Sequence, residues 1–347
     1  MIQRTDIQGR PRHAFQPEKG VLMSVIRLPG VQTAIRNFHQ LREEARAVGP
    51  LRVAIVCADD DVALEAASDA LAFGIATPQL LGDAGKIQLR AQRLGLNDLL
   101  ACAQIIDMPD AMDAARLACR MAAANESDLL MKGHLRTDEL LRSLLDRDAG
   151  LRTGRLLSDV LLYEDVLSRE ARLVGITDGG LNVLPTLEQK RQIVLNAIDV
   201  LHCIGIAHPR IAIMSATEAI TESMPSTVHA AALVEMADRG DFGDATVFGP
   251  LALDNALVLS AAQAKGITSA VAGRADCLVV PNVEAGNLLG KAVKYFGRSQ
   301  CAHVVAGARV PVLIPSRVES SNDKVNAMAL GVLFKTHAHR ELNEVLL

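Results

Sequence analysis

Short apolar runs alternate with amphipathic segments along most of the chain, and this alternation restricts the fold more than any other feature. The runs LRVAIVCADD and ATPQLLGD are typical of buried strands, and each precedes a segment with apolar residues at helical spacing. The same order returns at DLLMKG, RIAIMSA and DCLVVPN, and a first covering helix is predicted over residues 31–48. Repeated strand and helix units predict an α/β fold with a doubly wound, mostly parallel sheet.

The composition suits a sheet that is covered by helices. Hydrophobic residues make up 50% of the 347 residues and aromatic residues only 3%, so Ala, Val, Leu and Ile must fill the interior. A chain of this length exceeds one ordinary core, which predicts two domains. The net charge of -4 gives no basic field for a nucleic acid or an anionic membrane. An anionic ligand must therefore be held by a local group of cations.

The cysteines and the apolar segments indicate a cytoplasmic protein without a metal site. No apolar segment is long enough to span a bilayer, and the polar N-terminal segment lacks the apolar centre of a signal peptide. The six cysteines show no paired ligand spacing, and neither CxxC nor HExxH occurs, so we interpret them as reduced thiols. They are Cys57, Cys102, Cys119, Cys203, Cys277 and Cys301.

The domain organisation follows from two series of strand and helix units. We expect residues 1–30 to form a flexible N-terminal arm, with Met23 as an alternative start and packing on a partner subunit as an alternative role. No Pro-rich or Ser-rich linker separates the two series, so the boundary should be a compact crossover. The predicted division places residues 31–155 and 306–347 in a first α/β domain and residues 156–305 in a second.

Residues 314–331, IPSRVESSNDKVNAMALG, carry the side chains best suited to chemistry. They follow an apolar run and precede an amphipathic one, which predicts a strand-to-helix corner at an open edge of the sheet. Ser316, Arg317 and Asp323 offer a hydroxyl, a fixed cation and a carboxylate, which together can hold a phosphoryl group and move a proton. A structural interpretation also fits, because the polar residues 320–323 are good helix N-cap residues.

A second candidate anion site lies in DLLMKGHLRTDELLRSLL. Lys132 and Gly133 end a predicted strand just before a helix that starts near Thr137, and a cation beside a helix N-terminus favours anion binding. His134 is interpreted as a polar turn residue, and the arginines that follow also suit a solvated helix face. Neither GxGxxG nor GxxxxGK[ST] occurs, which argues against a dinucleotide fingerprint and a P-loop.

Taken together, these segments resemble the phosphate acetyl/butyryl transferase family from about Val53 onward. The matching segments follow the family's order: LMKGHLRTDELLRSLL, GLRTGR, VLPTLEQK, SATEAITESMPST, FGPLALDNA, AGRADCLVVPNVEAGNLLGKAVKYF and PVLIPSRVESSNDK. The EAGN run at residues 284–287 and the Ser-Arg pair are closer to the phosphate butyryltransferase branch than to the acetyl branch.

The resemblance implies a fold, a reaction and an assembly. The fold would be two α/β domains with a cleft between them, similar to isocitrate and isopropylmalate dehydrogenases. The reaction would convert a short-chain acyl-CoA and phosphate into an acyl phosphate and CoA, with CoA and phosphate as substrates and without a permanently bound cofactor or metal. Small molecules are then the expected partners, and a homodimer is the usual assembly of the family.

The resemblance also assigns roles by position. Ser316 and Arg317 match the family's Ser-Arg pair, and Asp323 matches its catalytic aspartate. In this assignment the carboxylate accepts the proton of the CoA thiol, the serine stabilises developing negative charge, and the arginine binds acyl phosphate oxygens. The candidate residues for binding CoA, phosphate or the acyl group are Lys132, Gly133, Thr137, Arg142, Gly286 and Asn287.

Two positions depart from the family pattern. Ser158 and Asp159 stand where the family often has Ser-His, and Phe248 precedes Gly249-Pro250 where an acid is common. Two other functions stay open: a phosphate acyltransferase that uses acyl carrier protein, and a non-catalytic relative that binds CoA or an acyl phosphate. An isocitrate-type dehydrogenase is disfavoured, because no cluster of Asp residues lies beside a basic pocket in the sequence.

Overall fold

A single sheet of eleven strands runs through the described part of the chain. The computed structural model describes residues 33–168, 170–316 and 319–345. The sheet order is β3-β2-β1-β4-β11-β10-β5-β6-β9-β7-β8. The strands are β1 (Leu51–Val56), β2 (Ala76–Gly82), β3 (Gln104–Asp107), β4 (Leu129–Lys132), β5 (Ser158–Glu164), β6 (Leu173–Thr177), β7 (Arg210–Met214), β8 (Thr246–Leu251), β9 (Cys277–Val279), β10 (Cys301–Ala306) and β11 (Val312–Leu313).

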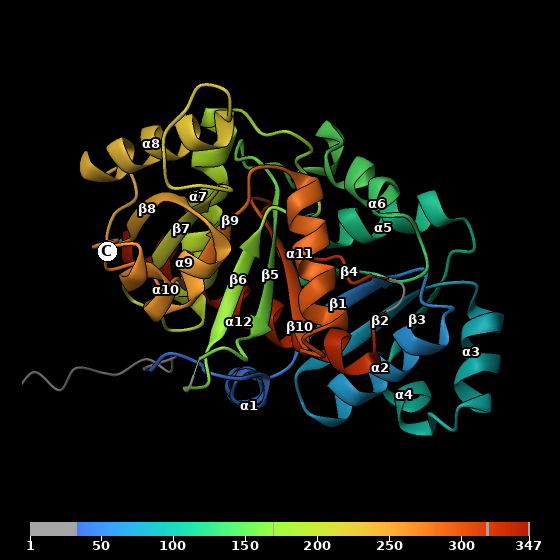
Figure 1. Ribbon diagram of the computed structural model, residues 1–347. Coiled ribbons are helices and arrows are strands. Elements are labelled where there is room, and N and C mark those ends of the chain that lie inside the picture. The colour runs from blue at the N-terminus through green and yellow to red at the C-terminus, as the bar shows by residue number, and fades with distance from the viewer. Residues whose placement is uncertain (1–32, 169, 317–318, 346–347) are drawn as a thin grey trace, which may run out of the picture. The chain divides into compact units, whose positions relative to one another are not determined.

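Twelve α-helices among the described residues cover the two faces of this sheet (Figure 1). They are α1 (Phe38–Val48), α2 (Asp61–Ala72), α3 (Ala84–Arg93), α4 (Asn97–Cys102), α5 (Ala111–Ala123), α6 (Thr137–Leu144), α7 (Leu187–Cys203), α8 (Pro225–Asp238), α9 (Leu253–Leu257), α10 (Leu259–Ala264), α11 (Val283–Tyr295) and α12 (Ser321–Val345). A short 3₁₀ helix spans Arg147–Ala149. These observations confirm the predicted α/β class.

The sheet is parallel on both sides and antiparallel in its middle. The strands from β3 to β11 pair in parallel, and so do β6, β9, β7 and β8. Between them, β10 runs antiparallel to β11 and to β5, and β5 runs antiparallel to β6. The mostly parallel sheet was predicted. The antiparallel centre was not, and the predicted edge position of the strand before Ser316 was wrong, because β11 lies inside the sheet between β4 and β10.

One face of the sheet packs on a continuous aliphatic core. Because side chains alternate along a strand, Val160 of β5 and Val304 of β10 point into this core, together with residues of α1, α2, α7, α8 and α12. Burial of aliphatic area on this scale is the main stabilising contribution to such a fold. One face of the sheet is therefore covered by a single continuous core.

The opposite face carries two separate cores. One packs α5 and α6 against β1, β4 and β11, and the other packs α9, α10 and α11 against β5, β6, β7 and β9. Between the two cores, the alternation along β5 and β10 places Asp159 and His303 on this face. The interruption of the helical cover thus coincides with polar side chains.

Local capping determines where several elements begin. The helix predicted over residues 31–48 begins only at Phe38, because the Asn37 side chain caps it by accepting a hydrogen bond from the Gln40 amide. At the other end of the chain, Ser320 precedes α12 and forms a reciprocal pair with Asp323: the Asp323 amide donates to Ser320 Oγ at 3.3 Å, and the Ser320 amide donates to Asp323 Oδ2 at 3.1 Å. The capping interpretation of residues 320–323 is therefore confirmed.

Two predictions about the domain organisation stay predictions. The N-terminal arm, residues 1–30, lies outside them. The division into residues 31–155 with 306–347 and residues 156–305 stays a prediction, since one sheet joins both parts. In the described part of the chain, no helix combines the length and apolar character that crossing a membrane requires.

Helix α11 crosses in front of the middle of the sheet (Figure 1) and packs there through a glycine contact. A Cβ on Gly286 would lie 2.6 Å from Gly179 Cα and 3.0 Å from the Asp178 carbonyl oxygen, so α11 rests directly on the turn that follows β6. The Asp178 carboxylate shapes this turn by accepting hydrogen bonds from the amides of Gly180 and Leu181, at 2.8 and 2.9 Å. Gly286, a predicted binding residue, therefore has a packing role.

The variant Gly286→Ala should lower the free energy of unfolding by about 2 kcal/mol, because the new methyl group meets backbone atoms that cannot move aside. Urea unfolding measures this change. Gly290→Ala in the same helix is the matched control: its Cβ meets only the end of the Leu161 side chain, at 3.2 Å, and should change stability by less than about 1 kcal/mol. Equal losses in both variants would contradict the glycine contact.

Candidate functional site

A cavity of about 380 Å³ opens where the two cores of the interrupted face separate. Its apolar lining includes Leu161, Ile176 and Ile314, and α11 contributes further lining residues. This volume is within the usual range for small-molecule sites. The charged and polar side chains that line it are Lys132, Thr137, Asp159, Asn287, Lys291, Lys294, Tyr295, His303, Ser316 and Glu319.

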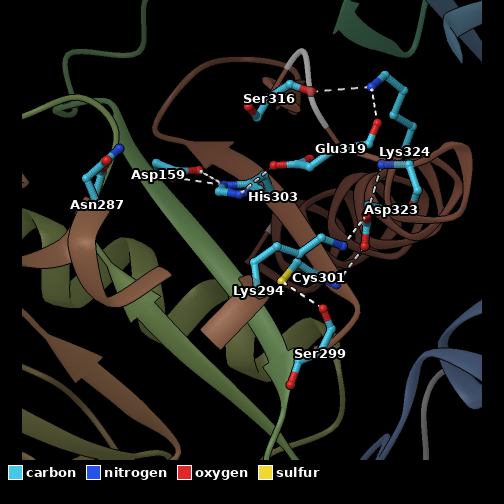
Figure 2. Close-up of polar contacts among 12 residues, drawn as sticks. Asp159, Asn287, Lys294, Ser299, Cys301, His303, Ser316, Glu319, Asp323 and Lys324 are labelled. Atoms are coloured by element: carbon cyan, nitrogen blue, oxygen red, sulfur yellow. Dashed lines mark hydrogen bonds and ion pairs between the residues drawn. The ribbon is translucent and has the colours of Figure 1, made fainter. Parts of the chain in front are cut away.

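A histidine between two carboxylates is the central polar feature of the cavity (Figure 2). His303 Nδ1 lies 3.1 Å from both carboxylate oxygens of Asp159, and His303 Nε2 lies 3.4 Å from Glu319 Oε1. The side chains are largely shielded, with exposures of 17% for His303, 3% for Asp159 and 11% for Glu319. Both ring nitrogens therefore face an acceptor, which is the arrangement that suits a protonated imidazolium.

The electrostatics of this group follow from burial and proximity. Burial alone lowers the pKa of His303, but the Asp159 carboxylate and then Glu319 outweigh it and hold the pKa well above its ordinary value. Burial raises the pKa of Glu319, but the hydrogen bond with His303 outweighs it, so the net pKa is lowered. The three groups thus favour a cation held between two anions.

The segment that carries Ser316 is tied down at several points. The Ser316 carbonyl accepts a hydrogen bond from the Glu319 amide at 3.1 Å and one from Lys324 Nζ at 3.4 Å. Lys324 Nζ also donates to the Glu319 carbonyl at 3.1 Å, and its side chain is buried in the first turn of α12. Ser316 is therefore fixed from the helix on one side and, through Glu319, from the sheet on the other (Figure 2).

Asp323 lies behind the cavity wall. Its carboxylate pairs with Lys294 Nζ and accepts hydrogen bonds from the Cys301 amide at 3.0 Å and from Ser320 Oγ at 2.6 Å. Burial raises the pKa of Asp323, but Lys294, Ser320 and the Cys301 amide outweigh it and lower the pKa overall. Asp323 is buried and is not among the residues that line the cavity, whereas its partner Lys294 lines it.

The structure brings together most of the residues predicted from the sequence. Five of them line the cavity, namely Lys132, Thr137, Gly286, Asn287 and Ser316. Gly133 serves close packing instead, since a Cβ there would lie 2.3 Å from the Cys57 carbonyl oxygen. Arg142 lies on α6 outside the cavity lining, with a side chain that is 71% exposed and 3.7 Å from Asp138. Arg317 lies outside the described residues.

Several functional candidates were not predicted. His303 and Glu319 were missed, and Asp159 was noted only as a departure from the family pattern. Ser158, its neighbour, is buried on the other side of β5 and accepts a hydrogen bond from Asn196 Nδ2 at 2.8 Å. A histidine inside the apolar run CAHVVAGARV was the one available signal in the sequence, because a buried strand seldom holds a titratable side chain without a partner.

Cations dominate the side of the cavity formed by α11. Lys291 and Lys294 lie one turn apart on this helix, and Lys132 faces them from the end of β4. Lys294 is paired with Asp323, and Lys291 makes no ion pair with a described residue. This arrangement can bind an anion such as phosphate, because the ammonium groups converge on a partly shielded space.

The region that forms the site matches a known family. Residues 107–332 match the family model described as phosphate acetyl/butaryl transferase. The phosphate acetyltransferase of Rickettsia felis is 39% identical over 318 residues, which cover 91% of this chain and 89% of the relative. The phosphate butyryltransferase of Clostridium beijerinckii is 38% identical over 298 residues, which cover 86% of this chain and 97% of the relative.

Solved structures show the same likeness. A branched-chain phosphotransacylase from Enterococcus faecalis V583 superposes with a TM-score of 0.72 at 28% identity and covers 82% of this chain and 99% of its own. A phosphotransacetylase from Streptococcus pyogenes superposes with a TM-score of 0.72 at 20% identity, covering 86% of this chain and 98% of its own, which shows likeness of fold.

The bridge at His303 should make stability depend on pH. A raised pKa means that the folded chain binds the proton more tightly, so the contribution is complete below the unfolded pKa of about 6.5 and is lost as pH rises through the folded pKa. His303→Gln should therefore cost about 2 kcal/mol near pH 6 and less at alkaline pH. Urea unfolding at stepped pH measures the difference.

The variant Asp159→Asn tests the cause of this shift. Without the carboxylate that raises the pKa of His303 most, the loss of stability should move to lower pH. A pH-independent difference between the wild type and His303→Gln would show that the histidine is not protonated in the folded chain.

Proposed function

The chain belongs to the phosphate acetyl/butyryl transferase family and is a phosphate acyltransferase, and we propose that it moves a short-chain acyl group reversibly between CoA and inorganic phosphate. The observation that carries the proposal is the convergence of Ser316, Lys132 and Thr137 on one cavity, although they come from segments far apart in the chain. A hydroxyl and several cations in a partly shielded space suit the binding of phosphate beside a thioester.

The proposed reaction needs a nucleophile, an electrophile and charge stabilisation. An oxygen of phosphate attacks the thioester carbonyl carbon, and the carbon–sulfur bond breaks as the CoA thiolate leaves with the electron pair. Lys132 and Lys291 hold the phosphate in this proposal, and the Ser316 hydroxyl donates a hydrogen bond to the charge that develops on the acyl oxygen or the thiolate. Arg317, beside Ser316 in the sequence, binds the acyl phosphate oxygens.

Asp323 acts in this proposal through Lys294. A carboxylate with a lowered pKa is a weak proton acceptor, and four groups already donate to it: Lys294 Nζ, the Cys301 amide, and the amide and hydroxyl of Ser320. Its charge holds the Lys294 ammonium at the cavity wall, where the cation can stabilise a departing thiolate. Arg142 is proposed to contribute to substrate binding from α6, the helix whose first residue, Thr137, lines the cavity.

The finer structural and cellular features also belong to the proposal. These are the likeness to isocitrate and isopropylmalate dehydrogenases with a cleft between two domains, a homodimer in the cytoplasm, and CoA and phosphate as substrates without a permanent cofactor. The interruption between two cores supports a cleft at the cavity, and six free cysteines support a reducing compartment. Relatives named for acetyl transfer and for butyryl transfer have nearly the same sequence identity to this chain. The proposed assignment to the butyryl branch therefore rests on the sequence motifs alone.

The proposal predicts CoA release from acyl-CoA that depends on phosphate. Ser316→Ala, Arg317→Ala and Asp323→Asn should each lower kcat/KM by about a hundredfold or more, because each removes a group that stabilises developing charge or holds one that does. A thiol-release assay across acetyl-, propionyl-, butyryl- and longer acyl-CoAs, with and without phosphate, measures both activity and chain preference. Full activity in all three variants would contradict the site assignment.

A matched pair of arginine variants tests the outer part of the site. Arg142→Ala should raise KM for acyl-CoA by about tenfold through the loss of one charged contact. Arg116→Ala is the control, since Arg116 is also exposed and pairs with an aspartate of its own helix, Asp113 at 3.1 Å. Equal KM values in the two variants would remove Arg142 from the proposed site.

The same assay separates the two other functions. A preference for acyl carrier protein over CoA as the acyl carrier would place the chain in lipid synthesis instead. CoA binding by calorimetry without turnover of any acyl chain would indicate a non-catalytic relative. The retained Ser316 and Asp323 favour an active enzyme.

A further inference from the structure

His303 has no part in the proposed reaction, yet its side chain lines the cavity. It is the residue that connects Asp159 of β5 to Glu319 of the segment before α12, with its two ring nitrogens 3.1 and 3.4 Å from their oxygens. In the register of the sheet, His303 stands opposite Leu161, and Asp159 is its diagonal neighbour on the same face. The bridge thus spans from the sheet to a loop.

The bridge reaches the Ser316 segment through Glu319. The Glu319 amide donates to the Ser316 carbonyl, so the position of Glu319 fixes the backbone that presents the serine. On the other side, Lys324 holds the carbonyls of the same two residues. Without the bridge, the segment would be held by Lys324 and by its chain connection to β11, and Glu319 would lose its contact with β10.

The bridge also offsets negative charge in the cavity. Among the described residues, Lys132, Lys291 and Lys294 face Asp159 and Glu319, with Asp323 directly behind Lys294. A protonated His303 adds one positive charge between Asp159 and Glu319. With a neutral residue in its place, the two carboxylates would have no cation between them beside an incoming dianion.

We propose that His303 is a positioning residue for phosphate: as an imidazolium it bridges Asp159 and Glu319, holds the Ser316 segment against β10, and offsets a carboxylate charge beside the bound phosphate. This inference rests on the proposed function, since it takes the cavity as the place where phosphate meets the thioester. Loss of the bridge should weaken the binding of phosphate more than the binding of acyl-CoA. The carboxylates of Asp159 and Glu319 would then repel the phosphate directly.

The first measurement is the KM of each substrate in His303→Gln. Glutamine is neutral but can still donate to one carboxylate. KM for phosphate should rise about tenfold, while KM for acyl-CoA and kcat change by less than about threefold. A purely structural role would change both KM values and kcat together. His202→Gln is the matched control, because His202 also lies beside a carboxylate, Asp244 at 3.2 Å, but outside the cavity lining.

The decisive measurement is rescue by charge. The double variant His303→Gln with Glu319→Gln removes one cation and one carboxylate, so KM for phosphate should return to within about threefold of the wild type. If KM for phosphate is unchanged in His303→Gln, or stays raised in the double variant, the inference is wrong.

A second pair of variants keeps the test valid if His303→Gln does not fold. Glu319→Gln retains an acceptor for His303, whereas Glu319→Ala does not. The kcat/KM of the alanine variant should be about tenfold lower than that of the glutamine variant, because only glutamine can still contact His303 and hold the Ser316 segment. Equal values in the two would overturn the positioning role.

The controls distinguish failure of this inference from failure of the proposed function. If the wild type releases CoA with phosphate and Ser316→Ala is impaired, the function stands, and an unchanged KM for phosphate in His303→Gln overturns the inference alone. If the wild type shows no phosphate-dependent release from any acyl-CoA, both are overturned.

Discussion

Continuous aliphatic packing on one face of the sheet is the constraint on which the rest of the structure depends. Val160 and Val304 point into that core, and their neighbours Asp159 and His303 consequently point to the other side. Because the first face is buried under this core at β5 and β10, the second can be left open over these central strands without exposing the sheet on both sides. The cavity exists where the helical cover of the second face is divided into two cores.

The elements of the fold could largely be predicted from the sequence, because their signals are local. The apolar run LRVAIV forms β1, and Asp60 caps the helix that follows it. The strand order could not be predicted in the same way. β5 and β10 are neighbours only through backbone pairing between residues far apart in the chain. The sequence of neither strand indicates which strand it pairs with. The antiparallel centre therefore emerged only from the structure.

The same difference between local signals and long-range contacts decides which site residues could be predicted. Ser316 and Asp323 were recognisable, because they belong to one short segment whose residue types and family resemblance agree. The link from Asp159 through His303 to Glu319 depends on a diagonal contact between two strands and on a loop that folds back over them. Residue types spread over three segments gave no signal until the register of the sheet was known. The pairing of Asp323, in the first turn of α12, with Lys294, in the last turn of α11, likewise depended on the tertiary structure.

The strand order also constrains how the chain can assemble during synthesis. β4 and β5 are consecutive in the chain, yet β11 and β10, from residues 301–313, lie between them in the sheet. The two sides of the sheet cannot be joined until the ribosome has made these late residues, since domains fold as their segments become available. The centre of the sheet, and with it the floor of the cavity, is completed only when the C-terminal part of the chain arrives. The cavity, whose lining includes His303, Ser316 and Glu319, is thus incomplete in any chain that stops before these residues.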